Sequence, residues 1–314
     1  MKKVISLVVP IYNEETGVRE FLDGQLLPEI EKLEYRTEMI LVNDGSRDGT
    51  AEEIRQTKLI KREGVKLISF TKNFGKEMAL TAGLREATGD AAVMIDADGQ
   101  HPVTEVARMI EKWKQGARVV TAVAKEKNTK HGLGSRMFYG LMKMLGNKDF
   151  HPGALDFRLV DREVIEEFKK FTERNRITRG LVDWLGYPQE YIEVKTRGRK
   201  NGKPTYTTPM LIRLAVDSLV SSSRTPLVIF GYIGVGITIF SLVLGLFILI
   251  QQYVLGDPMG LDWSGAVAMS VFVSFLIGLV LISQAITALY VSQIHAEAKD
   301  RPLYVIDKRK SIGL

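Results

Sequence analysis

The sequence predicts an α/β protein, a domain with a mostly parallel sheet followed by two C-terminal transmembrane helices. Two observations favour this. Short apolar runs alternate with helical patterns over residues 1–125, as expected for parallel strands covered by helices on both faces. Residues 225–256 and 263–294 then contain no Asp, Glu, Lys, Arg or His, and each stretch exceeds the roughly 20 residues that cross a bilayer.

The first apolar run, residues 4–9, is short and ends at Pro10, so it indicates a strand and not a signal peptide. The expected strands are 4–9, 38–42, 65–70, 91–95 and 118–123, and the expected helices are 15–33, one beginning at 50, 75–87 and 104–114. Residues 133–145 and 209–220 fit amphipathic helices, either at the membrane interface or packed on the sheet.

The basic residues around the two apolar stretches predict their orientation. Arginines precede the first stretch, lysines and arginines follow the second, and the connector at 257–262 has neither. By the positive-inside rule, both chain ends lie in the cytoplasm. The absence of cysteine suits that side of the membrane. The alternative is a pair of core helices, which rarely run so long without charge.

The chain carries a net charge of +6. Because lysines and arginines cluster near the predicted spans, anionic lipid headgroups are favoured over nucleic acid as a partner.

Polar loops follow four of the expected strands. They comprise residues 10–14, 43–46, 71–75 and 96–100. Ligands of open parallel sheets bind beyond the carboxyl ends of the strands. The sequence therefore predicts that these four loops meet in one binding site.

Asp96 and Asp98 lie two residues apart directly after an expected strand, and Gln100 adds an amide oxygen. Hard oxygen ligands suit Mg²⁺ or Mn²⁺, and such a cation can neutralise a departing diphosphate. The alternative is a pair of turn or helix-capping aspartates. His101 is expected to lie behind the ligands or to face solvent.

Further polar residues in or beyond these loops each allow two interpretations. Asp44 could accept a hydrogen bond from a nucleoside base or form a turn. Lys72 and Lys76 could meet phosphate charge or lie on a solvated face. Asp156 and Arg158 would face one site if their segment is extended, or would form a structural salt bridge.

A basic cluster stands shortly before the first apolar stretch. It comprises Arg197, Arg199, Lys200 and Lys203. A membrane-borne phosphate is a natural counter-ion for such a cluster.

Several motifs carry a resemblance to a known family. They are residues 8–15 (VVPIYNEE), 43–50 (NDGSRDGT), 73–76 (NFGK), 96–102 (DADGQHP), 156–158 (DFR) and 179–181 (RGL). They resemble family 2 glycosyltransferases of the GT-A (Rossmann-like) fold. More narrowly, with the two apolar stretches, they resemble polyprenyl-phosphate glycosyltransferases such as the dolichol-phosphate mannose synthases and bactoprenol glucosyltransferases.

The resemblance implies inverting transfer of one sugar from a nucleotide-diphospho-sugar, with UDP-glucose or another UDP-hexose favoured, to polyprenyl (undecaprenyl) phosphate. The protein would be integral to the bacterial plasma membrane, with its catalytic domain cytoplasmic.

The resemblance also implies roles for individual residues. Pro10, Tyr12, Glu14 and Asp44 would hold the nucleoside, and Asp96, Asp98 and Gln100 the metal and diphosphate. Asp156 stands where the family places its proposed base. We therefore expect Asp156 and Asp98 to be catalytic, Lys72 and Lys76 to join Asp96 at the donor, and Arg136, Arg158, Arg197 and Lys203 to bind the acceptor phosphate.

The chain departs from the family pattern at two places. Asn43 replaces the first of two aspartates, and the usual Gly-x-Ser-Lys-Tyr stretch reads Gly-Lys-Pro-Thr-Tyr at 202–206. Lys203 is the candidate for the missing lysine. The acceptor is a phosphate monoester with a second pKa near roughly 6, so we expect Asp156 to orient it more than to deprotonate it.

We expect four parts: residues 1–125 bind the nucleotide-sugar, 126–224 serve the acceptor, 225–296 form the transmembrane hairpin, and 297–314 form a basic tail. One alternative function is a processive polysaccharide synthase, but two spans are too few for a channel. Another is a non-catalytic nucleotide-binding membrane scaffold, against which the intact acidic residues argue. Glycines at 234, 236 and 278 permit close helix packing, and thus a homo-oligomer.

Overall fold

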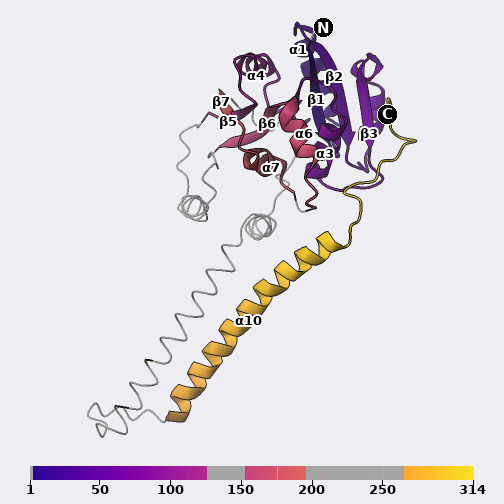
Figure 1. Cartoon of the computed structure of the whole chain (residues 1–314). Coiled ribbons are helices and arrows are strands. Elements are labelled where there is room, and N and C mark those ends of the chain that lie inside the picture. The colour runs from indigo at the N-terminus through magenta and orange to yellow at the C-terminus, as the bar shows by residue number, and fades with distance from the viewer. Residues whose placement is uncertain (1–2, 126–152, 175, 196–242, 244–249, 251–264) are drawn as a thin grey trace. The chain divides into compact units, whose positions relative to one another are not determined.

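The structure is a computed structural model that describes residues 3–125, 153–174, 176–195, 243, 250 and 265–314 (Figure 1). Its centre is a seven-stranded sheet in the order β3-β2-β1-β4-β6-β5-β7. The strands are β1 (Val4–Ile11), β2 (Arg36–Asn43), β3 (Val65–Ser69), β4 (Ala91–Met94), β5 (Val119–Ala124), β6 (Ala154–Asp161) and β7 (Gln189–Val194). Only β6 runs antiparallel to its neighbours within this sheet, so the predicted mostly parallel α/β sheet is confirmed.

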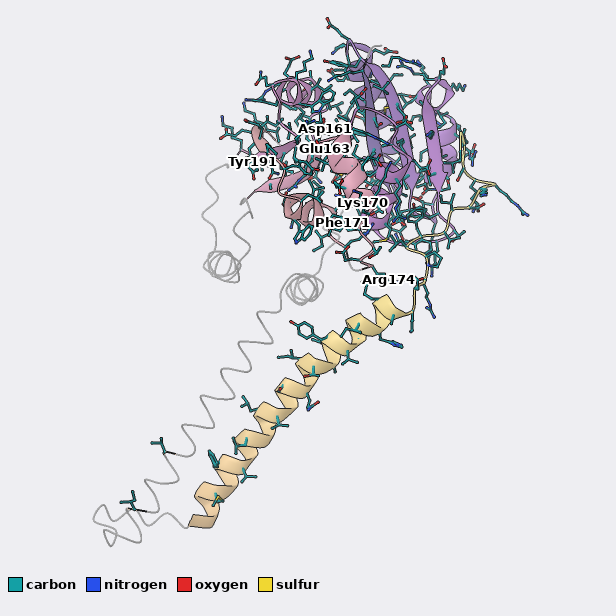
Figure 2. The ribbon with its side chains drawn as sticks, viewed as in Figure 1. Asp161, Glu163, Lys170, Phe171, Arg174 and Tyr191 are labelled. Atoms are coloured by element: carbon teal, nitrogen blue, oxygen red, sulfur yellow. The ribbon has the colours of Figure 1, made fainter. Side chains whose placement is uncertain are left out.

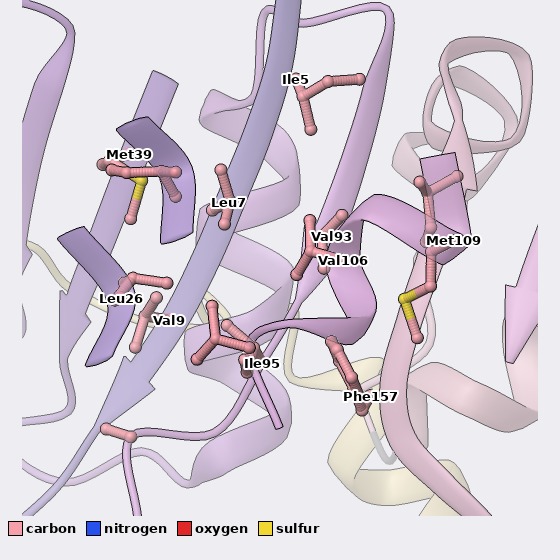
Figure 3. Packing of buried hydrophobic residues seen from close by; sticks show 14 of the residues in the cluster. Ile5, Leu7, Val9, Leu26, Met39, Val93, Ile95, Val106, Met109 and Phe157 are labelled. Atoms are coloured by element: carbon pink, nitrogen blue, oxygen red, sulfur yellow. The ribbon is translucent and has the colours of Figure 1, made fainter. Parts of the chain in front are cut away.

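Helices cover both faces of the sheet because alternate strand residues point to opposite sides. One face packs against η1 (Glu20–Leu26), α1 (Leu27–Glu31), α2 (Thr50–Arg55) and α4 (Glu105–Lys114). Figure 3 shows Leu7 and Val9 of β1 on this side with Leu26, Val106 and Met109. The other face packs against α3 (Lys76–Glu86), α6 (Arg162–Lys169) and α7 (Thr178–Trp184). A short helix, η2 (Leu59–Lys61), precedes β3.

The register aligns the carboxyl ends of the parallel strands. Ile11 of β1 pairs with Asn43 of β2, and Asn43 pairs with Ser69 of β3. On the other side of β1, Val8 pairs with Met94 of β4. The four polar loops therefore leave the sheet at one edge, as the sequence predicts.

Residues 153–195, for which the sequence predicts no strand or helix, contribute two strands and two helices to this domain. Figure 2 labels Asp161 and Glu163 at the junction of β6 and α6. The Asp161 carboxylate accepts a hydrogen bond from the Glu163 backbone N–H (3.0 Å) and another from Trp113 Nε1 (2.6 Å). This buried aspartate therefore caps α6 and joins it to α4.

Contacts divide the chain into two units, Met1–Thr205 with Arg301–Leu314, and Tyr206–Asp300. The second unit contains α10 (Gly265–Ala298), which overlaps the second expected span. Taken over the residues that the structure describes, no helix is both long and apolar enough to cross a membrane. The expected span at 225–256, apart from Val243 and Ile250, and the amphipathic helices at 133–145 and 209–220 lie outside the described residues. The two spans stay a prediction.

Candidate functional site

The loops after β1 and β2 are locked together by hydrogen bonds. Asn13 adopts a left-handed backbone (φ 51°), a conformation that Asn tolerates better than most residues. Its side-chain oxygen accepts from Arg47 N–H, and its own N–H donates to Ser46 Oγ, both at 3.0 Å. Glu14 N–H donates to Thr50 Oγ1 at 2.8 Å. This rigid pair of loops carries Tyr12, whose side chain is 41% exposed.

Asp44 ties the loop after β3 to the loop after β2. One carboxylate oxygen accepts from Phe74 N–H (2.7 Å), and the other accepts from Gly75 N–H and the Asn73 amide (both 2.9 Å). Burial raises the pKa of the Asp44 carboxyl, and the two backbone donors offset part of that effect. Asp44 therefore shapes residues 73–75, a role that the sequence did not indicate. Its predicted contact with a nucleoside base stays a prediction.

Close backbone approach at this junction requires glycine. Gly45 has φ +63°, and a Cβ there would lie 2.2 Å from the Lys72 carbonyl carbon. Gly75 has φ +101°, in the region that favours glycine. Gly45 is thus needed for the loops after β2 and β3 to touch, and Gly75 for the backbone conformation just before α3.

Lys76 and two aspartates form an ion cluster at the same edge. The Lys76 ammonium, in the first turn of α3, lies 2.8 Å from an oxygen of Asp96 and 2.9 Å from an oxygen of Asp156. Asp96 follows β4 and Asp156 lies on β6, strands that pair directly. Lys72, by contrast, places its ammonium 5.2 Å from the centre of the Phe74 ring. The structure thus brings Lys76, Asp96 and Asp156 together and places Lys72 against an aromatic ring.

The ion pair of Lys76 and Asp156 favours the charged form of both groups. Burial alone would raise the pKa of Asp156, but the charge and hydrogen bond of Lys76, with smaller effects of Arg179 and Arg158, hold that pKa below its usual range. Burial alone would lower the pKa of Lys76, and the two carboxylates raise it instead. The Lys76 ammonium is therefore shared between the side chains of Asp96 and Asp156.

Asp98 and Gln100 form a compact turn beside this cluster. One Asp98 oxygen accepts from Gln100 N–H (3.0 Å) and the other from the Gln100 side-chain amide (2.9 Å). Within the described residues, no group of three or more His, Cys, Asp or Glu side chains is arranged to hold a metal ion. The donor set still fits Mg²⁺ or Mn²⁺, because Mg²⁺ in phosphate-transfer sites is usually held by one or two carboxylates plus oxygens of the substrate.

His101 is a buried neighbour of Asp96 in this cluster. It is 7% exposed, and its Nε2 lies 3.4 Å from an Asp96 oxygen. Its ring centre is 5.5 Å from that of Phe157. Burial lowers the pKa of His101, although the nearby carboxylates oppose that effect. Of the two expected placements of His101, the structure favours the one behind Asp96 over the one facing solvent.

Arg158 was expected at the acceptor phosphate, but the structure favours the salt-bridge alternative. Its side chain is 2% exposed and lies 2.6 Å from an oxygen of Asp183 on α7. It also donates to the Leu155 carbonyl at 3.4 Å. The guanidinium is thus paired within the domain, as expected because a buried charge without a partner is strongly destabilising. The other three expected acceptor residues, Arg136, Arg197 and Lys203, lie outside the described residues.

Arg179 and Glu77 belong to this region and were missed as site residues. The positive charge of Arg179 helps to lower the pKa of Asp156. Glu77 accepts a hydrogen bond from Thr178 N–H at 2.7 Å, which joins the start of α3 to α7. Position 179 lies in the RGL motif, which was noted in the sequence without a role. Glu77 follows Lys76 directly, and no other signal marks it.

Comparisons with known proteins agree with this geometry. Residues 6–169 match the family described as Glycosyl transferase family 2. The chain is 36% identical over 310 residues to the bactoprenol glucosyl transferase of Shigella phage SfX, covering 98% of this chain and 99% of that one. It is 36% identical over 311 residues to the uncharacterized glycosyltransferase YkcC of Bacillus subtilis (strain 168), covering 98% and 94%.

A solved structure shows the same fold. Glucosyl-3-phosphoglycerate synthase from Mycobacterium tuberculosis, in complex with Mn²⁺, uridine-diphosphate and phosphoglyceric acid, is similar with a TM-score of 0.50 and 21% sequence identity. The likeness covers 70% of this chain and 78% of that one. At this level of identity it bears on the fold alone.

Proposed function

The chain belongs to glycosyl transferase family 2, and from this premise we propose that it transfers a single sugar from a nucleotide-diphospho-sugar to polyprenyl phosphate. One observation carries the proposal: Lys76, Asp96 and Asp156 converge within 2.9 Å at the edge where four strand-end loops meet. The near full-length likeness to a bactoprenol glucosyl transferase supports the lipid acceptor.

The loops after β1, β2 and β3 would bind the nucleoside end of the donor. Tyr12 offers an exposed aromatic ring beside the interlocked loops, and aromatic faces suit stacking against a base. Pro10, near the end of β1, and Glu14 lie on either side of it in the chain, and Asp44 holds residues 73–75 in place. UDP-glucose is the donor we favour, because the named relative is a glucosyl transferase.

The end of β4 would hold a divalent cation, Mg²⁺ or Mn²⁺. Asp96, Asp98 and Gln100 supply oxygen ligands on one short turn, and donor phosphates would complete the shell. When bound, the cation would neutralise charge on the departing nucleoside diphosphate. Lys76 supplies a fixed positive charge beside the same carboxylate, and Lys72 is within the same loop region for further phosphate contacts.

The transfer itself needs little proton chemistry. An oxygen of the acceptor phosphate forms a bond to the anomeric carbon while the bond from that carbon to the nucleoside diphosphate breaks, and the configuration inverts. Because the second pKa of a phosphate monoester is about 6, the acceptor is already an oxyanion at neutral pH. Asp156 would therefore position the acceptor and Lys76, and most of the rate would come from alignment and electrostatics.

The acceptor side would be basic and close to the membrane. Arg179 is a candidate for the acceptor phosphate because its charge acts on Asp156. Arg136, Arg197 and Lys203 remain proposed on sequence grounds. We also propose that 225–256 and 263–294 span the membrane as a hairpin, with the catalytic domain and both termini cytoplasmic, anionic lipids nearby and helix packing that permits a homo-oligomer.

A direct transfer assay tests this function. Membranes containing the full chain are incubated with undecaprenyl phosphate, Mg²⁺ or Mn²⁺ and one of several radiolabelled donors, including UDP-glucose, UDP-N-acetylglucosamine and GDP-mannose. One labelled lipid carrying a single sugar is the expected product. A labelled polymer would indicate a processive synthase. No labelled product from any donor, despite nucleotide binding, would favour a non-catalytic scaffold.

A further inference from the structure

The C-terminal tail, residues Arg301–Leu314, pairs with the edge of the catalytic sheet. β3 is an outer strand, so one side of its backbone has no neighbouring strand in the sheet. Leu67 and Ile312 exchange two backbone hydrogen bonds there, at 2.9 and 2.8 Å. Figure 1 shows the yellow C-terminal segment beside β3. The sequence predicted only a basic tail here, and in the structure this tail covers a sheet edge that would otherwise be open.

Side chains from other elements hold the tail in this place. Ser311 Oγ accepts from Ser69 N–H at 3.0 Å and donates to the Asp307 carbonyl at 2.8 Å. The Arg55 side chain, at the end of α2, donates to the Lys310 carbonyl. Polar groups along residues 307–311 are therefore used to fix the tail.

The pairing continues from β3 into the loop that Asp44 holds. Asp307 N–H donates to the Ser69 carbonyl at 2.8 Å, and Thr71 N–H donates to the Val305 carbonyl at 3.0 Å. Thr71 is the first residue of the polar loop 71–75. The tail thus contacts the first residue of the loop, whereas Asp44 holds its last residues, 73–75.

Three aromatic rings complete the link. Tyr304 stacks on Phe70 with ring centres 5.0 Å apart and planes 15° apart. Phe70 meets Phe74 edge to face at 5.7 Å. The backbone N–H of Phe74 then donates to Asp44. Since aromatic pairs contribute both buried area and preferred geometry, Tyr304 limits where Phe70 and Phe74 can lie.

We propose that the C-terminal tail is a positioning element of the donor site, in which Tyr304 fixes Phe70 and Phe74 so that loop 71–75 keeps the shape that receives a nucleoside diphosphate. The donor part of this inference rests on the proposed function. Tyr304 acts through other residues and touches no reacting atom. Without the ring, the Thr71–Val305 hydrogen bond and the Asp44 contacts would remain, but Phe70 would lose its stacked partner. The Phe74 end of the loop would then be less constrained, and Gly75 would let it sample other conformations.

The test compares Tyr304→Ala with Tyr304→Phe, which keeps the stacked ring, and with Lys308→Ala as a control in the same tail. Hydrogen exchange of a peptide covering residues 70–75 reports the loop directly. Titration with UDP and steady-state KM values for UDP-glucose and undecaprenyl phosphate report the donor and acceptor sites. Thermal unfolding checks that each full-length variant is folded.

Tyr304→Ala should speed exchange at Phe74 and Gly75 and weaken UDP binding about three- to tenfold, in line with the loss of one aromatic pair. The KM for the lipid acceptor should stay unchanged, and Tyr304→Phe and Lys308→Ala should match the wild type. Unchanged exchange in a folded Tyr304→Ala protein would overturn the positioning role. Faster exchange in a chain whose wild type binds no nucleotide would leave that role standing and overturn the proposed function.

Discussion

The Lys76 ammonium lies 2.9 Å from a carboxylate oxygen of Asp156, 80 residues further along the chain. The same ammonium lies 2.8 Å from Asp96. One positive charge therefore balances the first aspartate of the DxD motif and the aspartate expected at the acceptor. Asp96 is also a proposed metal ligand, so a cation bound there would compete with the Lys76 ammonium for the same carboxylate.

Replacing Lys76 should separate binding of the cation from turnover. Lys76→Ala removes the competing charge, so Mn²⁺ titrated into the donor-free protein should bind several-fold more tightly. Turnover should fall by about tenfold or more, because a fixed charge near the leaving diphosphate is lost. Electron paramagnetic resonance of free Mn²⁺ measures the first effect and the transfer assay the second.

Lys72→Ala is the matched control, since its ammonium faces the Phe74 ring and lies outside the cluster. It should leave Mn²⁺ affinity of the donor-free protein unchanged. Weaker Mn²⁺ binding by Lys76→Ala would mean that the lysine supports the metal ligands and does not compete with the cation.

The two aspartates should respond differently to loss of charge. Asp98→Asn should abolish metal-dependent turnover, because Asp98 is a proposed metal ligand and the other carboxylate of its turn, Asp96, is already paired with Lys76. Asp156→Asn should retain measurable activity, because the acceptor phosphate needs little deprotonation. Initial rates over a range of Mg²⁺ concentrations compare the two variants. Equal and complete loss from both would argue for an obligatory base at Asp156.

The pH dependence gives an independent check on Asp156. Its pKa is held below the usual value by Lys76 after burial is overcome, so it stays ionised as the pH falls through 6. The acid limb of kcat/KM should therefore follow the acceptor phosphate, with an apparent pKa of about 6. The same limb should persist in Asp156→Asn. Its disappearance in that variant would assign the titration to Asp156 itself.

Much of the donor side could be predicted from the sequence, because it depends on local patterns. Apolar runs of the right length gave the first five strands within one or two residues, and the polar loops follow strand ends directly. In parallel strands the carboxyl ends must meet at one edge. The convergence of Asp96 with the loops at Asp44 and Lys76 follows from that rule.

The remaining features depend on contacts between distant residues, which no local pattern encodes. The sequence contains several acidic residues that could pair with Lys76, so it does not show which of them do. Asp156 comes beside Asp96 because β4 pairs with β6. The pairing of Arg158 with Asp183 needs α7 to fold over β6. Likewise, nothing in the basic composition of residues 301–314 indicates that they return to β3.

The pair of Arg158 and Asp183 should matter for stability more than for catalysis. Asp183→Asn leaves the almost fully buried Arg158 charge without its carboxylate, so the free energy of unfolding should fall by about 3 kcal/mol. The KM for the lipid acceptor should change little, since the guanidinium faces into the domain. Denaturant unfolding and acceptor kinetics measure the two effects, with Arg62→Ala in an exposed ion pair as the control. A stable Asp183→Asn protein with a much higher acceptor KM would instead support a role of Arg158 in binding the acceptor phosphate.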